Sequence, residues 1–76
     1  MPHITIKLYP DRTREQKQEL SDKVTKAVMD VTGCRDEAVS VDIVDVKPED
    51  WTDKVYNPEI LPRMDQLIKK PGYDPD

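Results

Sequence analysis

The chain has 76 residues, a net charge of −4 and a single cysteine. A chain of this length buries about 60% of the surface that its unfolded form exposes, so its core stabilises it only marginally. Because Cys34 is the single cysteine, no internal disulfide can form. Cys34 and the single histidine, His3, supply fewer ligands than a zinc site needs, so we expect no metal. We therefore expect one domain, residues 1–76, that gains stability by self-association.

Charge and hydropathy exclude several classes of partner. Acidic and basic residues are interleaved along the chain, whereas a nucleic-acid-binding module shows a basic face. No apolar run approaches the ~18 residues of a membrane span. The N-terminus has no basic segment followed by an apolar one, as a signal peptide would have. With one free thiol, these features predict a cytoplasmic protein with no nucleic-acid or membrane partner.

The segment from residue 3 to residue 9 alternates between apolar and other residues. Ile4, Ile6 and Leu8 share one face, and the residues between them share the other. A period of two with β-branched residues predicts a strand that starts almost at the N-terminus. Pro10 and Asp11 follow it and are typical of a turn.

A long helix is predicted over about residues 14 to 32. Thr13 and Gln16 have the spacing of a capping box, in which each side chain bonds the other residue's backbone N–H. Gly33 follows, where a helix favours a left-handed residue. The apolar residues that recur at helical spacing are Leu20, Val24, Ala27, Val28 and Val31.

A second strand is predicted at about residues 38 to 46. Val39, Val41 and Ile43 alternate there with residues of the other face. Strand, helix and strand in this order form a β-α-β unit with parallel strands and a right-handed crossover. Two strands and one helix cannot close a core alone, so we expect two copies to pair into a four-stranded sheet.

The chain after residue 46 is expected to form a turn and a C-terminal helix. Residues 47–51 are predicted as a turn. Asn57 as N-cap and Pro58 at the first helical position predict a helix that ends near Lys70. Residues 73–76 are polar and are expected to fray. The fold class is therefore α/β, a β-α-β unit plus a C-terminal helix.

Pro2 carries the chemistry that this sequence suggests most strongly. Proline in second position permits removal of Met1, which leaves a secondary amine held rigid by its ring. An α-amino group titrates at about 7.7–8.0 in model peptides, and an apolar pocket or a nearby cation lowers that pKa. Such an amine is largely unprotonated near neutral pH, where a general base works best. The strand that begins at residue 3 would anchor it.

The other candidate base and nucleophile, His3 and Cys34, are expected to have no catalytic role. His3 is expected to be a solvent-facing or sheet-edge side chain. Cys34 is expected to be a small packing residue after the helix. Their spacing does not support a catalytic pair.

Several stretches of the chain resemble the 4-oxalocrotonate tautomerase family of the tautomerase superfamily. They are MPHITIK, Arg12-Thr13 with Glu15-Gln16-Lys17, AVSVDIVDV, Pro48-Glu49-Asp50-Trp51 and LIKKPGY. The first and the last two of these are most similar to the longer, dimeric branch, which acts on enols of phenylpyruvate-type acids. The resemblance implies the tautomerase fold, a cytoplasmic location, no cofactor and a processed N-terminal proline.

The resemblance also implies roles for individual residues. Pro2 matches the catalytic proline, which moves a proton between oxygen and carbon of the substrate. Arg12 matches an arginine that binds a substrate carboxylate, and a planar guanidinium suits that task. Trp51 matches an aromatic residue of the pocket wall. Arg12 could instead be a solvated loop charge, and Trp51 could be a core or interface residue.

Ser40 departs from the family pattern. It stands where hexameric members have a second arginine that polarises the substrate, and a serine donates a hydrogen bond but carries no charge. The change favours a monocarboxylate with an apolar or aromatic tail over a dicarboxylate such as 2-hydroxymuconate. The cations that could substitute for the arginine are Lys7, Arg14, Lys47 and Arg63.

The sequence thus predicts a cofactor-independent keto–enol tautomerase for enols of 2-oxo acids, such as phenylpyruvate or 2-hydroxy-alkenoates. We expect a homodimer, because the long C-terminal helix could cover the surface through which dimers form hexamers. Two alternatives remain open. One is dehalogenase- or decarboxylase-like chemistry of the same proline, and the other is a non-catalytic dimeric binding domain.

Overall fold

A computed structural model describes residues 1–75. These residues fall into two compact units: an N-terminal unit, Met1–Asp45, and a C-terminal unit that starts at Val46. No helix in the part of the chain that the structure describes is long and apolar enough to cross a membrane.

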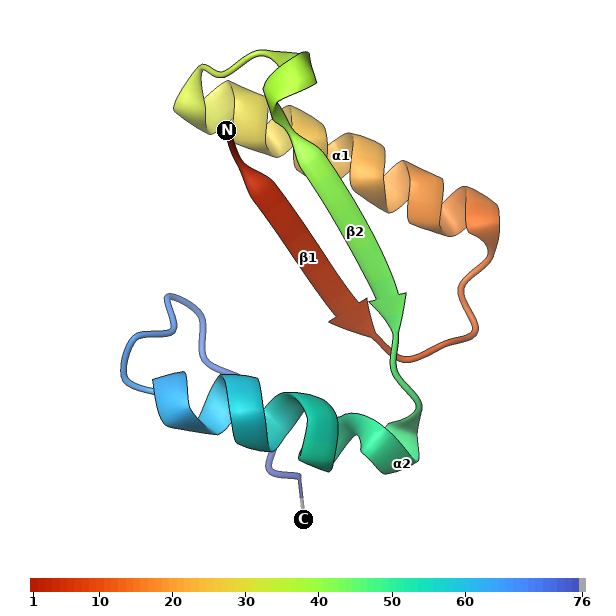
Figure 1. Ribbon diagram of the computed structural model, residues 1–76, viewed down its shortest axis with the longest axis vertical. Helices are drawn as coiled ribbons and strands as arrows, with labels where there is room; N and C mark the ends of the chain where they lie inside the picture. The colour runs from red at the N-terminus through yellow and green to blue at the C-terminus, as the bar shows by residue number, and fades with distance from the viewer. Residues whose placement is uncertain (76) are drawn as a thin grey trace. The chain divides into compact units, whose positions relative to one another are not determined.

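The N-terminal unit is the β-α-β unit that the sequence predicts. Strand β1 (His3–Leu8) leads into helix α1 (Arg14–Thr32), and a short 3-10 turn (Asp36–Ala38) leads into strand β2 (Ser40–Asp45). The two strands are parallel, with a register that runs from His3 opposite Ser40 to Leu8 opposite Asp45. Figure 1 shows α1 lying along one face of the strand pair.

Alternation along the strands separates an apolar face from a polar one. Ile4 and Ile6 lie opposite Val41 and Ile43, and these four side chains share the face toward α1. The opposite face carries His3, Thr5, Ser40 and Asp42, all exposed. The apolar pattern therefore determines which residues of each strand α1 covers, and it leaves a row of polar side chains on the outside.

Both ends of α1 have the predicted local structure. The Gln16 N–H donates to the Thr13 hydroxyl at 3.1 Å, and the Thr13 N–H donates to the Gln16 side chain at 2.9 Å, so the capping box is confirmed. Gly33 ends the helix at a φ of 77°, and its N–H donates to the carbonyl oxygen of Met29. At each end of the helix, a local hydrogen bond thus partners a backbone group of the terminal turns.

The predicted apolar stripe of α1 is wrong in one respect. Val24 and Val28 are half-buried as expected, but Ala27 is exposed and Val31 is 86% exposed. Thr25 is half-buried instead, because the face toward the strands is rotated about the helix axis relative to the apolar stripe. Ala27 and Val31 lie on the exposed flank of the helix.

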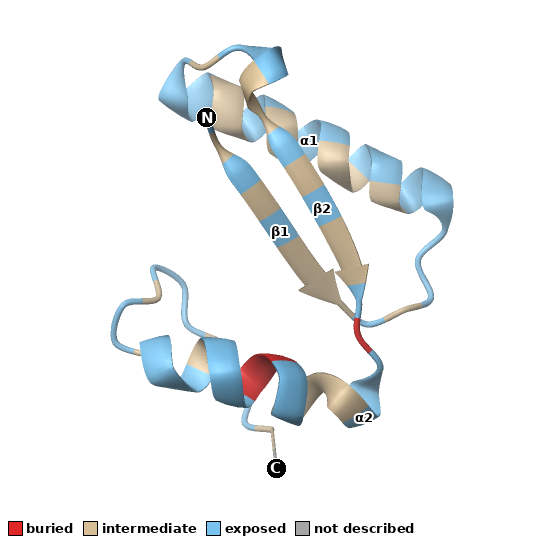
Figure 2. Cartoon of the chain, viewed as in Figure 1, coloured by how far each residue is buried: buried red, intermediate tan, exposed pale blue. Residues whose placement is uncertain are grey.

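Burial is low throughout the described chain. The residues classed as buried within residues 1–75 are Val46, Val55 and Tyr56, and none of them belongs to the strands or to α1 (Figure 2). The apolar strand residues are only half-buried. Helix and sheet are therefore well formed locally, while most of their apolar surface keeps partial access to solvent.

The C-terminal unit is helical, but its helix starts earlier than predicted. Helix α2 (Pro48–Trp51) continues into a π-helical segment, Thr52–Ile60, and a 3-10 turn, Leu61–Arg63. The predicted turn at residues 47–51 and the predicted helix start at Asn57 are therefore wrong, as is an end near Lys70.

The early start of this helix has a local physical cause. Pro48 lacks an N–H and takes the first helical position, where none is needed, and two acidic residues follow in the first turn. Pro58 then falls inside the helix rather than at its start. Its ring would clash with a carbonyl oxygen one α-helical turn earlier. The wider π-helical winding, in which the Leu61 N–H bonds the Tyr56 carbonyl oxygen, leaves room for it.

The predicted fraying of residues 73–76 is also wrong for Tyr73. The Trp51 indole N–H donates to the Tyr73 hydroxyl at 2.8 Å. The rings of Tyr73 and Tyr56 lie 5.9 Å apart between centroids. Aromatic contacts of this kind hold an irregular segment onto the helix that it follows. Asp76 lies outside the described residues.

Candidate active site

Pro2 lies immediately before β1, and the neighbouring strand anchors it. Its carbonyl oxygen accepts a hydrogen bond of 3.2 Å from the Ser40 N–H. Pro2 is half-buried, whereas Met1 is fully exposed. In the chain that begins with Met1, the Pro2 nitrogen is part of an amide and has no useful basicity.

Ser40 also contacts His3, a pair that the sequence interpretation missed. The ring nitrogen Nδ1 of His3 lies 2.6 Å from the Ser40 hydroxyl oxygen, on the polar face of the strand pair. His3 is exposed, as expected, but it is not isolated. Aligning the two alternating strand patterns in a parallel register places residue 3 opposite residue 40, and that alignment could have revealed the contact.

Arg12 lies at the other end of β1. It lines a hollow of about 220 Å³ together with Leu8, Gln16, Lys17 and Leu20. The strand supplies Leu8, the loop before α1 supplies Arg12, and the first turns of α1 supply the rest. The hollow combines two cationic side chains with apolar walls, which is a composition that suits an anion with an apolar body.

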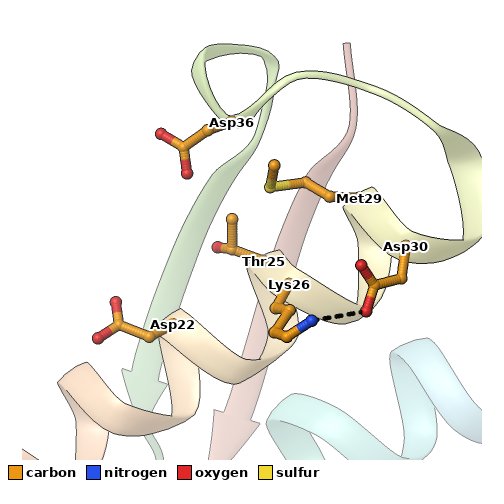
Figure 3. A pocket seen from close by; sticks show the side chains of 6 residues that line it. All are labelled: Asp22, Thr25, Lys26, Met29, Asp30 and Asp36. Carbon is orange, nitrogen blue, oxygen red and sulfur yellow. Dashed lines mark hydrogen bonds and ion pairs between the residues drawn. The ribbon is translucent and has the colours of Figure 1, made fainter.

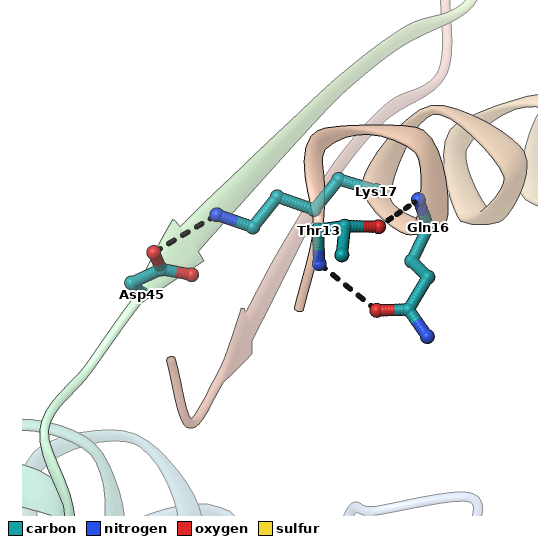
Figure 4. A network of polar contacts seen from close by, with 4 residues as sticks. All are labelled: Thr13, Gln16, Lys17 and Asp45. Atoms are coloured by element: carbon teal, nitrogen blue, oxygen red, sulfur yellow. Dashed lines mark hydrogen bonds and ion pairs between the residues drawn. The ribbon is translucent and has the colours of Figure 1, made fainter. Parts of the chain in front are cut away.

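The two cations of this hollow differ in their pairing. The Lys17 ammonium forms an ion pair of 2.9 Å with Asp45 at the end of β2, while Thr13 and Gln16 cap each other beside it (Figure 4). No carboxylate of residues 1–75 pairs with the Arg12 guanidinium. Arg12 is therefore the uncompensated charge of the hollow. Asp11, just before Arg12, has a φ of 88°, a conformation that aspartate adopts more readily than most residues.

Pro2 and Arg12 do not come together within one chain. Strand β1 has six residues and runs from His3, next to Pro2, to Leu8, which lines the Arg12 hollow. At about 3.3 Å for each residue, the strand spans about 20 Å. A 2-oxo acid is much shorter than that, so one molecule cannot contact both residues of the same chain.

Trp51 belongs to the C-terminal unit. It ends α2, is half-buried and uses its indole N–H to bind Tyr73. Its ring thus has a structural contact within the C-terminal unit.

A second hollow of the N-terminal unit has the wrong charge for an acidic substrate. This groove of about 430 Å³ lies along α1 (Figure 3). Lys26, its one cation, pairs with Asp30 at 3.0 Å. Its lining residues are Asp22, Thr25, Lys26, Met29, Asp30 and Asp36. Two further aspartates leave the groove acidic, which disfavours a carboxylate ligand.

The chain is similar to several known proteins. The family model described as tautomerase enzyme matches residues 2–54. A probable tautomerase of Xylella fastidiosa is 44% identical over 73 residues, which cover 96% of this chain and 89% of that protein. Tautomerase PptA of Cronobacter sakazakii is 39% identical over 75 residues, 97% of this chain and 99% of the relative.

Solved structures show the same fold. A 4-oxalocrotonate tautomerase isozyme structure from Methylibium petroleiphilum superposes with a TM-score of 0.63 at 44% identity, over 66% of this chain and 81% of that one. YwhB, a homologue of 4-oxalocrotonate tautomerase, gives 0.60 at 40% identity, over 62% and 77%. The chain is therefore a member of the tautomerase family, a class of isomerases.

Proposed function

We propose that this protein is a cofactor-independent keto–enol tautomerase for enols of 2-oxo acids, such as phenylpyruvate or 2-hydroxy-alkenoates, and that Pro2 is its general base. Removal of Met1 frees the proline nitrogen. The amine takes the proton of the 2-hydroxyl group and delivers a proton to C3, which gives the 2-oxo acid. No atom is gained or lost, so the reaction is an isomerisation that needs no second substrate.

The observation that carries this proposal is the anchoring of Pro2. A chain end is ordinarily mobile, and a mobile amine is a poor catalyst because proton transfer needs a fixed geometry. Here the Ser40 N–H holds the Pro2 carbonyl oxygen, and β1 begins at the next residue. The amine of the processed chain would thus start from a fixed backbone position.

We assign the substrate carboxylate to Arg12. Its guanidinium is the uncompensated charge of a hollow with apolar walls, and it can bind a carboxylate through two parallel hydrogen bonds. Because about 20 Å of strand separates it from the Pro2 of its own chain, Arg12 would serve the Pro2 of a second copy. Trp51 is proposed to provide an aromatic surface for the substrate tail, and Ser40 a hydrogen-bonding group.

Self-association as a homodimer follows from the same reasoning. A two-stranded sheet is marginal by itself, and both strands here expose an edge. The strands and α1 contribute no buried residue within the described chain, and Val31 exposes 86% of its surface. A second copy would cover such surface and supply the Arg12 that each Pro2 lacks. With one free thiol in the sequence, we place the enzyme in the cytoplasm.

Ketonisation of the phenylpyruvate enol, followed by its ultraviolet absorbance, tests the proposal. Intact mass first establishes that Met1 is absent from each protein. Pro2→Ala also permits Met1 removal but leaves a flexible primary amine. We expect it to lower kcat/KM by about 10²-fold, the scale of general-base catalysis.

Pro71→Ala is the matched control, because it changes a proline that is not at the terminus and should retain full activity. Equal rates for wild type and Pro2→Ala, with Met1 absent from both, would overturn the proposal. Release of halide from a 3-haloacrylate at a rate above that of ketonisation would instead assign the proline to dehalogenation.

A further inference from the structure

Ser40 makes two contacts where the strands begin. Its backbone N–H donates to the Pro2 carbonyl oxygen at 3.2 Å, and its hydroxyl oxygen lies 2.6 Å from Nδ1 of His3. Both contacts follow from the register, which pairs Ser40 with His3 across the parallel strands. Ser40 therefore binds Pro2 through its backbone N–H and His3 through its side chain.

The hydroxyl contact fixes one edge of the His3 ring. Because Nδ1 faces the Ser40 hydroxyl, Nε2 lies on the opposite edge of the ring. When the hydroxyl donates its proton to Nδ1, Nε2 carries the ring proton and is a donor. Both side chains are exposed, so Nε2 is accessible to a small molecule on this face of the strand pair.

The proposed reaction needs a donor close to Pro2. As the enol loses its hydroxyl proton, negative charge develops on the 2-oxygen, and a hydrogen bond aimed at that oxygen stabilises the transition state. Neighbouring Cα atoms lie about 3.8 Å apart, so His3 is within reach of a small acid bound at the Pro2 nitrogen. A single imidazole supplies one such hydrogen bond. It does not provide a site for a second carboxylate group of the substrate.

We propose that His3 is a catalytic residue that donates a hydrogen bond from Nε2 to the 2-oxygen of the substrate, and that Ser40 is a positioning residue that orients the His3 ring. This inference rests on the proposed function, because it assumes that Pro2 moves the proton. It refines the part proposed above for Ser40: the hydrogen-bonding group that Ser40 brings to the site acts through the His3 ring and not by direct contact with the substrate.

Three variants on processed chains test the assignment. Ser40→Ala removes the hydroxyl but keeps the N–H that binds Pro2, and it should lower kcat about tenfold with KM unchanged. His3→Gln should lower kcat by about 10²-fold, the scale expected for loss of one oxyanion donor. The double variant should match His3→Gln alone, because Ser40 acts through the ring that is already missing.

Thr5→Ala is the matched control, since Thr5 is exposed on the same face of β1 and has no part in the proposed reaction. It should keep wild-type kcat.

Two outcomes separate this inference from the proposed function. If Pro2→Ala abolishes ketonisation while His3→Gln and Ser40→Ala keep wild-type kcat, the role of His3 is refuted and that of Pro2 stands. If the losses of the two single variants multiply in the double variant, Ser40 does not act through His3. If Pro2→Ala keeps full activity, both proposals fail together.

Discussion

The backbone N–H of Ser40 donates a hydrogen bond of 3.2 Å to the carbonyl oxygen of Pro2, so the second strand holds the residue that precedes the first. This contact extends the ladder of β1 and β2 by one residue beyond the strand itself. Pro2 is thereby fixed by main-chain geometry, which a substitution of the Ser40 side chain leaves intact.

The separation of Pro2 and Arg12 predicts complementation between two inactive variants. Each of Pro2→Ala and Arg12→Ala should lose most activity alone. In an equimolar mixture refolded together, half of the dimers pair one variant with the other, and each such dimer holds one intact site of its two. About a quarter of wild-type activity should return.

The same kinetic assay before and after mixing provides the measurement. If Pro2 and Arg12 acted within one chain, every site in the mixture would lack one of them and no activity would return. Mixing Pro2→Ala with itself under the same refolding protocol is the control.

Thr13→Ala tests the capping box of α1. The variant loses the hydroxyl that accepts from the Gln16 N–H at 3.1 Å. It should lower the free energy of unfolding by about 1 kcal/mol, the usual effect of losing a helix cap. Urea denaturation at fixed protein concentration measures it. Thr25→Ala, inside the same helix, is the control: it removes a hydroxyl that no cap uses, and the higher helix propensity of alanine offsets part of the packing that is lost. Equal losses would argue against the cap.

Gly33→Ala and Gly72→Ala separate backbone strain from steric fit. A Cβ at either position would have no atom within 4 Å, so neither substitution creates a clash. Gly33 has a φ of 77°, which costs an alanine about 1 kcal/mol, and Gly72 has no such φ. Thermal unfolding of both variants at one protein concentration should show a lower Tm for Gly33→Ala only. A similar decrease for both would contradict the left-handed cap.

Trp51→Phe and Tyr73→Phe should weaken the anchoring of the C-terminal segment. Tyr73→Phe removes one partner of the 2.8 Å hydrogen bond and keeps the ring, at a cost of about 1 kcal/mol, whereas Trp51→Phe removes the other partner and also replaces the indole by a smaller ring. Limited proteolysis should cleave near Tyr73 faster in either variant. The double variant should be no worse than Trp51→Phe alone, because that variant already lacks the bond. Wild-type cleavage rates in both single variants would show that the bond does not hold this segment.

Local patterns predicted the N-terminal unit well. The alternation of Ile4 and Ile6, the pairing of Thr13 with Gln16, and the position of Gly33 each involve residues close in sequence, so each could be recognised without tertiary information. The family assignment from the sequence is confirmed by the matching family model and relatives.

The C-terminal unit was predicted less well because two prolines compete there for the start of a helix. Pro48 has the better position, and Pro58 is tolerated by π-helical winding that a sequence pattern does not reveal. The contact of His3 with Ser40 spans 37 residues, so it depends on strand register and not on any local motif. The roles of Pro2, Arg12, Trp51 and Ser40 stay predictions.

The central claim is that the free amine of Pro2 is the base, and one comparison tests it most directly. A preparation that retains Met1, verified by intact mass, is assayed for ketonisation of the phenylpyruvate enol before and after treatment with methionine aminopeptidase. The sequence downstream is identical, so only the Pro2 nitrogen changes from amide to amine. We predict an increase in kcat/KM of about 10²-fold or more on removal of Met1. Equal activity of the two forms would contradict the account.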